Sequence, residues 1–187
     1  MKLQRKHLCL VPLMACFVYT SSAADVEKLY YIGEAKLSSP SGQPRDSQAF
    51  LLEKVHDPNN QTIVERAIVV KADHTVEEHT ITMKVKGDTF TISDAGDTVH
   101  GSGKLFGPAW HWSYFKGTYE SSNGVRIEDE NYMTDPSVLV ARKKISAPDG
   151  TALMYMDITL KTVTLPTFTI LSESLKARAP TPTEKKP

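Results

Sequence analysis

Cysteine, net charge and long apolar runs are all scarce in this chain of 187 residues. The two cysteines, Cys9 and Cys16, both lie within the first 24 residues, so the rest of the chain cannot form a disulfide. Basic and acidic side chains balance at 22 each. This balance argues against a nucleic-acid-binding protein, which carries a net basic field. No apolar run reaches the roughly 20 residues that a membrane-spanning helix needs, so we expect no transmembrane span.

The first 24 residues have the pattern of a secretory signal peptide. Positive charges at Lys2, Arg5 and Lys6 come first, an apolar stretch over 8–19 follows, and small residues end at Ala24. Cleavage after Ala24 would leave 163 residues with a formal charge near −3. We therefore expect an exported protein, periplasmic or extracellular, which is stabilised by core burial rather than by disulfides.

The segment Leu13–Cys16 supports a second interpretation of the same region. It resembles the lipobox of bacterial lipoproteins, in which the cysteine becomes a lipidated N-terminus. Two alternatives therefore stay open: cleavage after Ala24, or a lipid anchor at Cys16 that holds the protein to a membrane.

Alternation of apolar and polar residues dominates the chain from Leu29 to Val163, which is typical of half-buried strands. Turn residues such as Gly87-Asp88 interrupt the alternation at short intervals. The expected strands are 29–37, 48–55, 62–71, 76–86, 89–93, 99–106, 110–119, 125–133, 138–145 and 151–163. Because the links are short, the pattern predicts an all-β, antiparallel up-and-down meander. Closure into a barrel of about eight to ten strands would remove exposed edges.

Local departures from this pattern set the remaining boundaries. Two glycines in the strand 99–106 predict a bend or a bulge. Residues 165–175 are ambiguous between a strand and a short helix, and a charged, Pro-rich segment follows. The domain organisation we predict is a signal peptide over 1–24, a barrel domain over 25–170 and a disordered Pro-rich C-terminal tail over 171–187.

Large aromatic side chains recur at every second position of one expected strand, so they share a face. We predict that this face points into the barrel and that Phe115, in the opposite phase, points outward. The candidate ligand-binding residues are Trp110, Trp112, Tyr114, Phe90 and Tyr132. A lumen of this size holds either packed side chains or one small ligand, so a filled core is the alternative.

Ionisable residues give little support to catalysis or metal binding. His79 shares a face with Ile81, where a lone histidine is usually a core residue. Asp129 is the one candidate for an inward carboxylate, whereas Glu128 and Glu130 are expected on a solvated surface. No motif for a nucleophile, a phosphate loop or a metal-binding helix is present, so we predict no catalytic residue, no metal and no cofactor.

Three segments add a resemblance to this pattern: Gly101–Trp112, Asp129–Met133 and Val138–Arg142. With the meander, they resemble lipocalin-like (calycin) barrels and, more narrowly, lipocalin-like proteins of the bacterial envelope. The resemblance implies either small apolar ligand binding or a structural role in the envelope.

These observations lead to three functional hypotheses. The first is an exported binding or carrier protein for a small apolar molecule in the lumen. The second is a structural or partner-docking envelope protein with a filled barrel and no ligand. The third is an enzyme that works in the lumen, which needs an inward acid or histidine such as Asp129 or His79 beside a buried polar partner. The free volume of the lumen separates the first two hypotheses.

Overall fold

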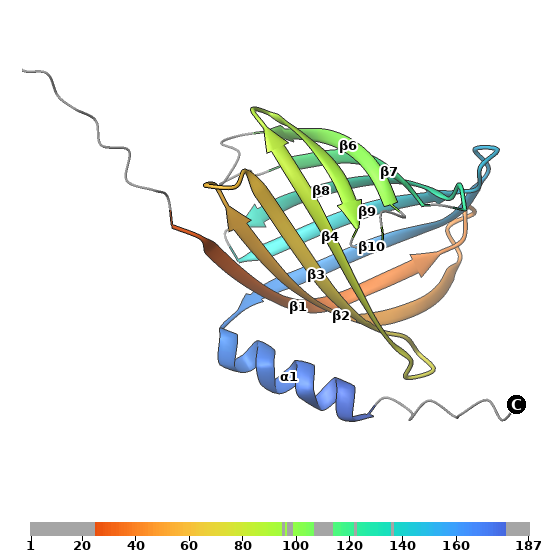
Figure 1. Cartoon of the computed structure of the whole chain (residues 1–187). Coiled ribbons are helices and arrows are strands. Elements are labelled where there is room, and N and C mark those ends of the chain that lie inside the picture. The colour runs from red at the N-terminus through yellow and green to blue at the C-terminus, as the bar shows by residue number, and fades with distance from the viewer. Residues whose placement is uncertain are drawn as a thin grey trace, which may run out of the picture.

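Within residues 25–94, 96, 99–106, 114–121, 123–135 and 137–178, a computed structural model describes ten strands and one helix (Figure 1). The elements are β1 (Glu27–Ser38), β2 (Pro44–Asp57), β3 (Thr62–Val70), β4 (Val76–Lys86), β5 (Thr89–Asp94), β6 (Val99–Phe106), β7 (Tyr114–Ser121), β8 (Arg126–Asp135), β9 (Val138–Ser146), β10 (Ala152–Val163) and α1 (Leu165–Arg178). The all-β prediction is confirmed, and each of the ten expected strands has its counterpart.

The strands form a closed barrel in which each strand pairs with its sequence neighbours. All pairs are antiparallel, and the ring closes between β1 and β10, where Tyr30 faces Val163 and Ser38 faces Tyr155. The up-and-down meander is therefore confirmed. Closure leaves no strand edge unpaired around the ring, as expected for a sheet with short connections.

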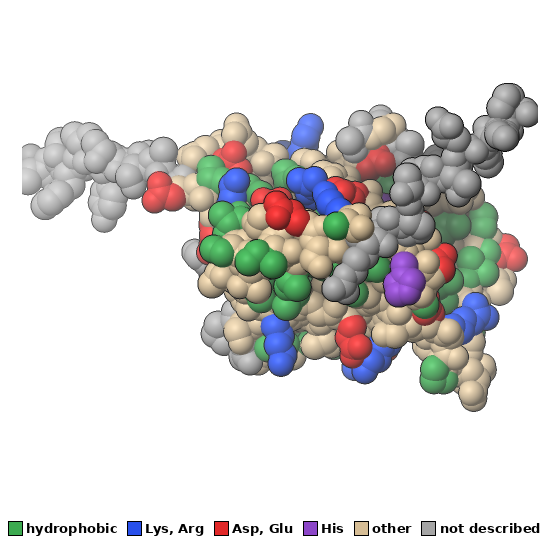
Figure 2. Space-filling model, turned by 90° about the horizontal axis from the view of Figure 1, so that it is seen from below, with side chains coloured by type: hydrophobic (Ala, Val, Ile, Leu, Met, Phe, Trp, Pro, Cys, Tyr) green, Lys and Arg blue, Asp and Glu red, His purple; other side chains and the backbone are tan. Residues whose placement is uncertain are grey.

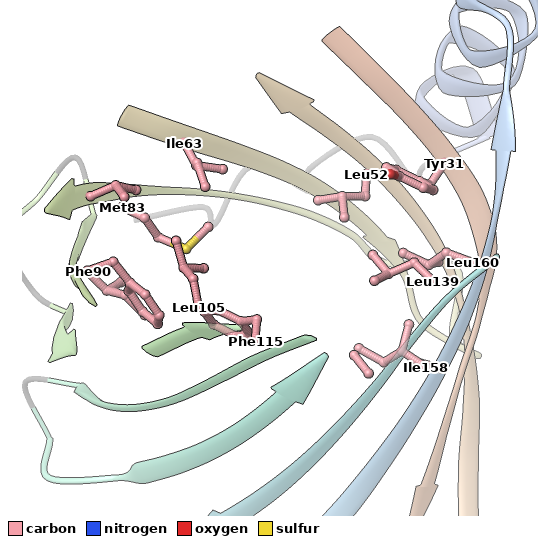
Figure 3. Close-up of a cluster of buried hydrophobic side chains, with 14 residues drawn as sticks. Tyr31, Leu52, Ile63, Met83, Phe90, Leu105, Phe115, Leu139, Ile158 and Leu160 are labelled. Atoms are coloured by element: carbon pink, nitrogen blue, oxygen red, sulfur yellow. The ribbon is translucent and has the colours of Figure 1, made fainter. Parts of the chain in front are cut away.

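Alternation along the strands sends one set of side chains into the barrel. In β4, Met83 and Val85 are buried, whereas their chain neighbours Thr82 and Lys84 are not. Figure 3 shows inward side chains from several strands, with Met83 near Phe90 and Leu160 near Leu139. The main core cluster lies inside the barrel, and its buried members come from every strand except β8, which adds the half-buried Met133.

One part of the lumen is filled by aromatic packing. The rings of Phe90 and Phe115 stack with centroids 4.7 Å apart. The Phe90 ring lies over two glycines, because a Cβ placed on Gly103 would overlap the ring and one placed on Gly117 would lie 3.0 Å from Phe90 Cζ. Of the bend or bulge expected in β6, the bulge is absent, since β6 pairs with both neighbours without a register shift. Position 103 is a glycine because the Phe90 ring occupies the space that a side chain there would need.

The helix α1 covers an apolar stripe on the outside of the barrel (Figure 1). Phe168 is buried against outward-facing Leu51 and Ile68, and its ring lies 5.2 Å from that of Tyr30. Lys176 also forms an ion pair with Glu78 of β4. Among the described residues no helix is long and apolar enough to span a membrane.

The helix changes the boundary expected at residue 170. Residues 171–178, which we assigned to the tail, continue α1 because Leu171 and Leu175 share the buried side with Phe168. The rest of the tail, 179–187, lies outside the described residues, as does the expected signal segment 1–24.

Figure 2, which views the molecule from the side of α1, shows charges of both signs with hydrophobic side chains between them.

Candidate ligand-binding cavity

A cavity of about 430 Å³ lies in the barrel lumen. Its apolar walls are Phe50, Leu52, Ala67, Val69, Ile81, Val99, Ile127, Leu139, Ala141, Ile145, Met156, Ile158 and Leu160. Its polar lining is Gln48, Glu65, Lys71, Glu77, His79, Tyr119, Asn131 and Lys143. The volume lies within the range of roughly 300–1,000 Å³ that is typical of small-molecule sites. A mostly apolar lining with a few polar groups is also typical of such sites.

Strands β2 and β3 place one ion pair inside the barrel. Lys54 and Glu65 face each other in register, and Lys54 Nζ lies 2.6 Å from Glu65 Oε1. The Lys54 side chain is only 2% exposed, whereas Glu65 also lines the cavity. A buried ammonium without a carboxylate would be costly. The ion pair with Glu65 therefore stabilises Lys54 inside the barrel.

Strands β8 and β9 place a second ion pair inside the barrel. Lys143 donates to Asp129 Oδ2 at 2.5 Å and to the Tyr119 hydroxyl at 3.1 Å. Asn131 donates its side-chain N–H to Asp129 Oδ1 at 2.9 Å. Both Asp129 oxygens are therefore engaged, and the prediction of an inward Asp129 is confirmed.

The two ion pairs act on each other's ionisation. Burial disfavours the charged Lys143, but Asp129 and Tyr119 outweigh burial and raise the pKa of Lys143. Burial raises the pKa of Glu65, but the attraction of Lys54 and, more weakly, of Lys143 outweighs burial, and the net pKa is lowered. Burial, with Glu65 and Glu27 nearby, raises the pKa of Tyr31 to about 12. Glu65 and Lys143 are thus charged near neutral pH.

Exposed charged side chains line the outer part of the cavity. Lys71 donates to Glu77 at 2.5 Å, and His79 lies 3.6 Å from the same carboxylate. The His79 side chain is 61% exposed. The face that His79 shares with Ile81 does point into the lumen, but His79 lies at its open mouth rather than in the core.

Two of the predicted binding residues, Phe90 and Tyr132, are not among the residues that line the cavity. Phe90 is buried in the filled part of the lumen and is not among the cavity-lining residues. Tyr132 is half-buried and in the opposite phase to inward-pointing Asn131. Tyr114 begins β7, in register with Tyr132 of β8. Trp110 and Trp112 lie outside the described residues.

The phase expected for β7 is corrected at Phe115. This residue was expected to face outward, but it is buried in the core and stacks on Phe90. Alternation then places Gly117 and Tyr119 on the same inward face. Glycine at 117 hides this phase in the sequence, because it leaves the inward face without an apolar side chain at that position.

Sequence reasoning missed Glu65, Lys54 and Lys143, and treated Asp129 as the one inward carboxylate. A signal for all three was present. Lys54 is in phase with Leu52, Glu65 is in phase with Ala67, and Lys143 is in phase with Ala141. A charged residue that occupies an apolar phase on a strand points into a barrel unless a bulge intervenes.

Asp129 meets the geometric condition stated for an enzyme, since it is inward and has buried polar neighbours. Its chemistry does not favour proton transfer. Its two oxygens accept from Lys143 and Asn131, and it is not a cavity-lining residue. The raised pKa of Lys143 also makes that amine a poor base or nucleophile. Within the described part of the chain no group of three or more His, Cys, Asp or Glu side chains could hold a metal ion.

No known protein family and no curated protein matches this sequence. Among solved structures, the chain is similar to a protein of unknown function from the DUF3598 family of Nostoc punctiforme. The two are 11% identical with a TM-score of 0.53, over 72% of this chain and 46% of that one, so this chain spans less than half of its length.

A second similar structure is the S-type phycobiliprotein lyase CPES from Guillardia theta. The two are 9% identical with a TM-score of 0.54, over 72% of this chain and 87% of the lyase. Both similarities fit the expected lipocalin-like barrel at the level of the fold. At these identities the likeness shows the fold alone.

Proposed function

We propose that this chain is an exported binding or carrier protein for a small, mainly apolar ligand held in the barrel lumen. The observation that carries the proposal is the cavity of about 430 Å³, which has apolar walls and an opening beside His79. An apolar ligand that enters this cavity leaves water, which favours binding. A filled barrel, which the structural or docking alternative requires, would leave no such volume.

One of the similar structures lends support at the level of the fold. It is named a phycobiliprotein lyase, so a barrel of this topology belongs to at least one protein with a stated biochemical activity. The support is that a barrel of this fold can carry a biochemical activity.

A blocked lumen tests the proposal. Ala67 of β3 lines the cavity, so Ala67→Trp should occupy the volume and weaken binding of the apolar dye N-phenylnaphthylamine by at least about tenfold. The measurement is a fluorescence titration of the dye. The matched control is Ala49→Trp on β2, where the side chain is exposed and borders the outer groove under α1. Equal dye binding by Ala67→Trp and the unaltered protein would contradict a lumenal site.

Export is a separate part of the proposal, and it rests on residues 1–24. The intact mass of the protein purified from its own host is expected to correspond to cleavage after Ala24. A mass with acyl chains on Cys16 would assign the lipid-anchored alternative instead. A full-length chain without lipid would contradict export.

A further inference from the structure

Two of the buried charged groups still have hydrogen-bonding capacity toward the cavity. The Lys143 ammonium has three N–H donors, of which Asp129 and Tyr119 take two. Glu65 has two carboxylate oxygens, and Lys54 contacts Oε1. Both side chains line the cavity, with 20% of Lys143 and 23% of Glu65 exposed. The inner cavity therefore offers a donor and an acceptor to the same ligand.

The charges around these two groups cancel. Lys54 and Lys143 are positive, and Glu65 and Asp129 are negative, so the two pairs sum to zero. His56 and Tyr31 are further ionisable groups near Glu65, and His56 Nδ1 lies 3.4 Å from the carboxylate of Glu27. At the mouth, Lys71 is balanced by Glu77.

A charged ligand would disturb this balance. An anionic head group that approached Lys143 would compete with Asp129 and would also face the carboxylate of Glu65. A cationic head group that approached Glu65 would compete with Lys54 and would be repelled by the ammonium of Lys143. Since an unbalanced charge in an enclosed cavity is costly, both kinds of ligand lose affinity. A neutral group that both accepts and donates a hydrogen bond satisfies both sides without adding charge.

We propose that the lumen selects uncharged amphiphiles whose polar end both accepts from Lys143 and donates to Glu65, such as a primary amide or an alcohol on an apolar body. The inference rests on the proposed binding function and specifies its ligand class. The apolar body lies along the walls that include Leu139 and Ile158. The polar end lies between β3 and β9, the strands that carry Glu65 and Lys143.

Four ligands with the same ten-carbon chain test this selectivity: decanamide, its N,N-dimethyl derivative, decanoate and decyltrimethylammonium. Each competes with N-phenylnaphthylamine near pH 8, where histidines are mostly neutral. Decanamide should displace the dye at concentrations at least about tenfold lower than the other three. The dimethyl amide accepts but cannot donate, so equal displacement by it would overturn the role of Glu65. Equal or stronger displacement by decanoate or by the cation would overturn the selection of neutral ligands.

A charge substitution makes the test sharper. Glu65→Gln removes one negative charge and leaves the cluster near +1, so decanoate should gain at least about tenfold in affinity over the unaltered protein. If the variant is less stable, decanoate should also raise its melting temperature, because it binds the folded state. The control is Glu53→Gln on β2, which is in the opposite phase to Lys54 and should change nothing. No gain for decanoate in Glu65→Gln would contradict the charge argument.

The outcomes separate this inference from the proposed function. If the dye does not bind the unaltered protein, or if none of the four ligands displaces it, the lumenal binding function fails and the inference fails with it. If the dye binds and is displaced with the wrong order of ligands, the binding function stands and only the ligand class is overturned.

Discussion

Replacement of Lys143 by methionine is expected to lower the free energy of unfolding by about 3 to 5 kcal/mol. The substitution keeps an unbranched side chain of similar length but leaves Asp129, which is 5% exposed, without its cation. The Asn131 hydrogen bond remains, but it does not neutralise the carboxylate. Urea unfolding followed by circular dichroism measures the loss.

The double variant Lys143→Met with Asp129→Leu is the decisive comparison. It removes both charges, so most of the loss seen in Lys143→Met should be recovered. Such recovery would show that the pair contributes little net stability and that its cost appears when one partner is left alone. A double variant as unstable as the single one would instead mean that Lys143 stabilises the barrel through Tyr119 or through packing.

The pH dependence gives this prediction a second measurement. Burial already raises the pKa of Asp129 in the unaltered protein, where Lys143 opposes that rise. Without Lys143 the folded-state pKa of Asp129 should lie further above its unfolded value. The stability deficit should then be full at neutral pH and should shrink as pH falls through the folded-state pKa, because the protonated acid no longer carries charge. A deficit of constant size down to about pH 4 would contradict the assignment to Asp129.

The fold was accessible from the sequence because its determinants are local. Period-two alternation and short turns can be recognised within each segment of the sequence. The bounds predicted for β4 are the same as those in the structure. The helix α1 was less accessible. Its buried side is Phe168, Leu171 and Leu175, and threonine and serine surround these residues. The reason for a helix there is the apolar stripe outside β2 and β3, which is a tertiary feature.

The site was less accessible because it depends on contacts between strands. Alternation alone can place Lys54 or Lys143 inside a barrel, but it cannot say which carboxylate each one meets. That follows from the register, which sets Lys54 opposite Glu65 and Lys143 opposite Asp129. The aromatic residues were conspicuous in the sequence, yet the phase at Phe115 was misread because glycine occupies the next inward position.

Phe90 offers the clearest separation of core from site, because it was predicted to bind ligand and lies in the filled part of the lumen. Phe90→Ala is expected to lower the free energy of unfolding by about 3 to 5 kcal/mol. The ring is 2% exposed, stacks on Phe115 and covers Gly103, so its loss leaves a void that the strands cannot readily close. Urea unfolding measures this loss.

Dye binding by the same variant tells the two roles apart. Because Phe90 does not line the cavity, Phe90→Ala should bind N-phenylnaphthylamine as the unaltered protein does when both are fully folded. Leu139→Ala is the matched comparison: Leu139 is equally buried but lines the cavity, so its loss should change both stability and dye affinity. If Phe90→Ala weakens dye binding as much as Leu139→Ala does, the ring belongs to the binding site after all. The open part of the lumen would then extend as far as Phe90.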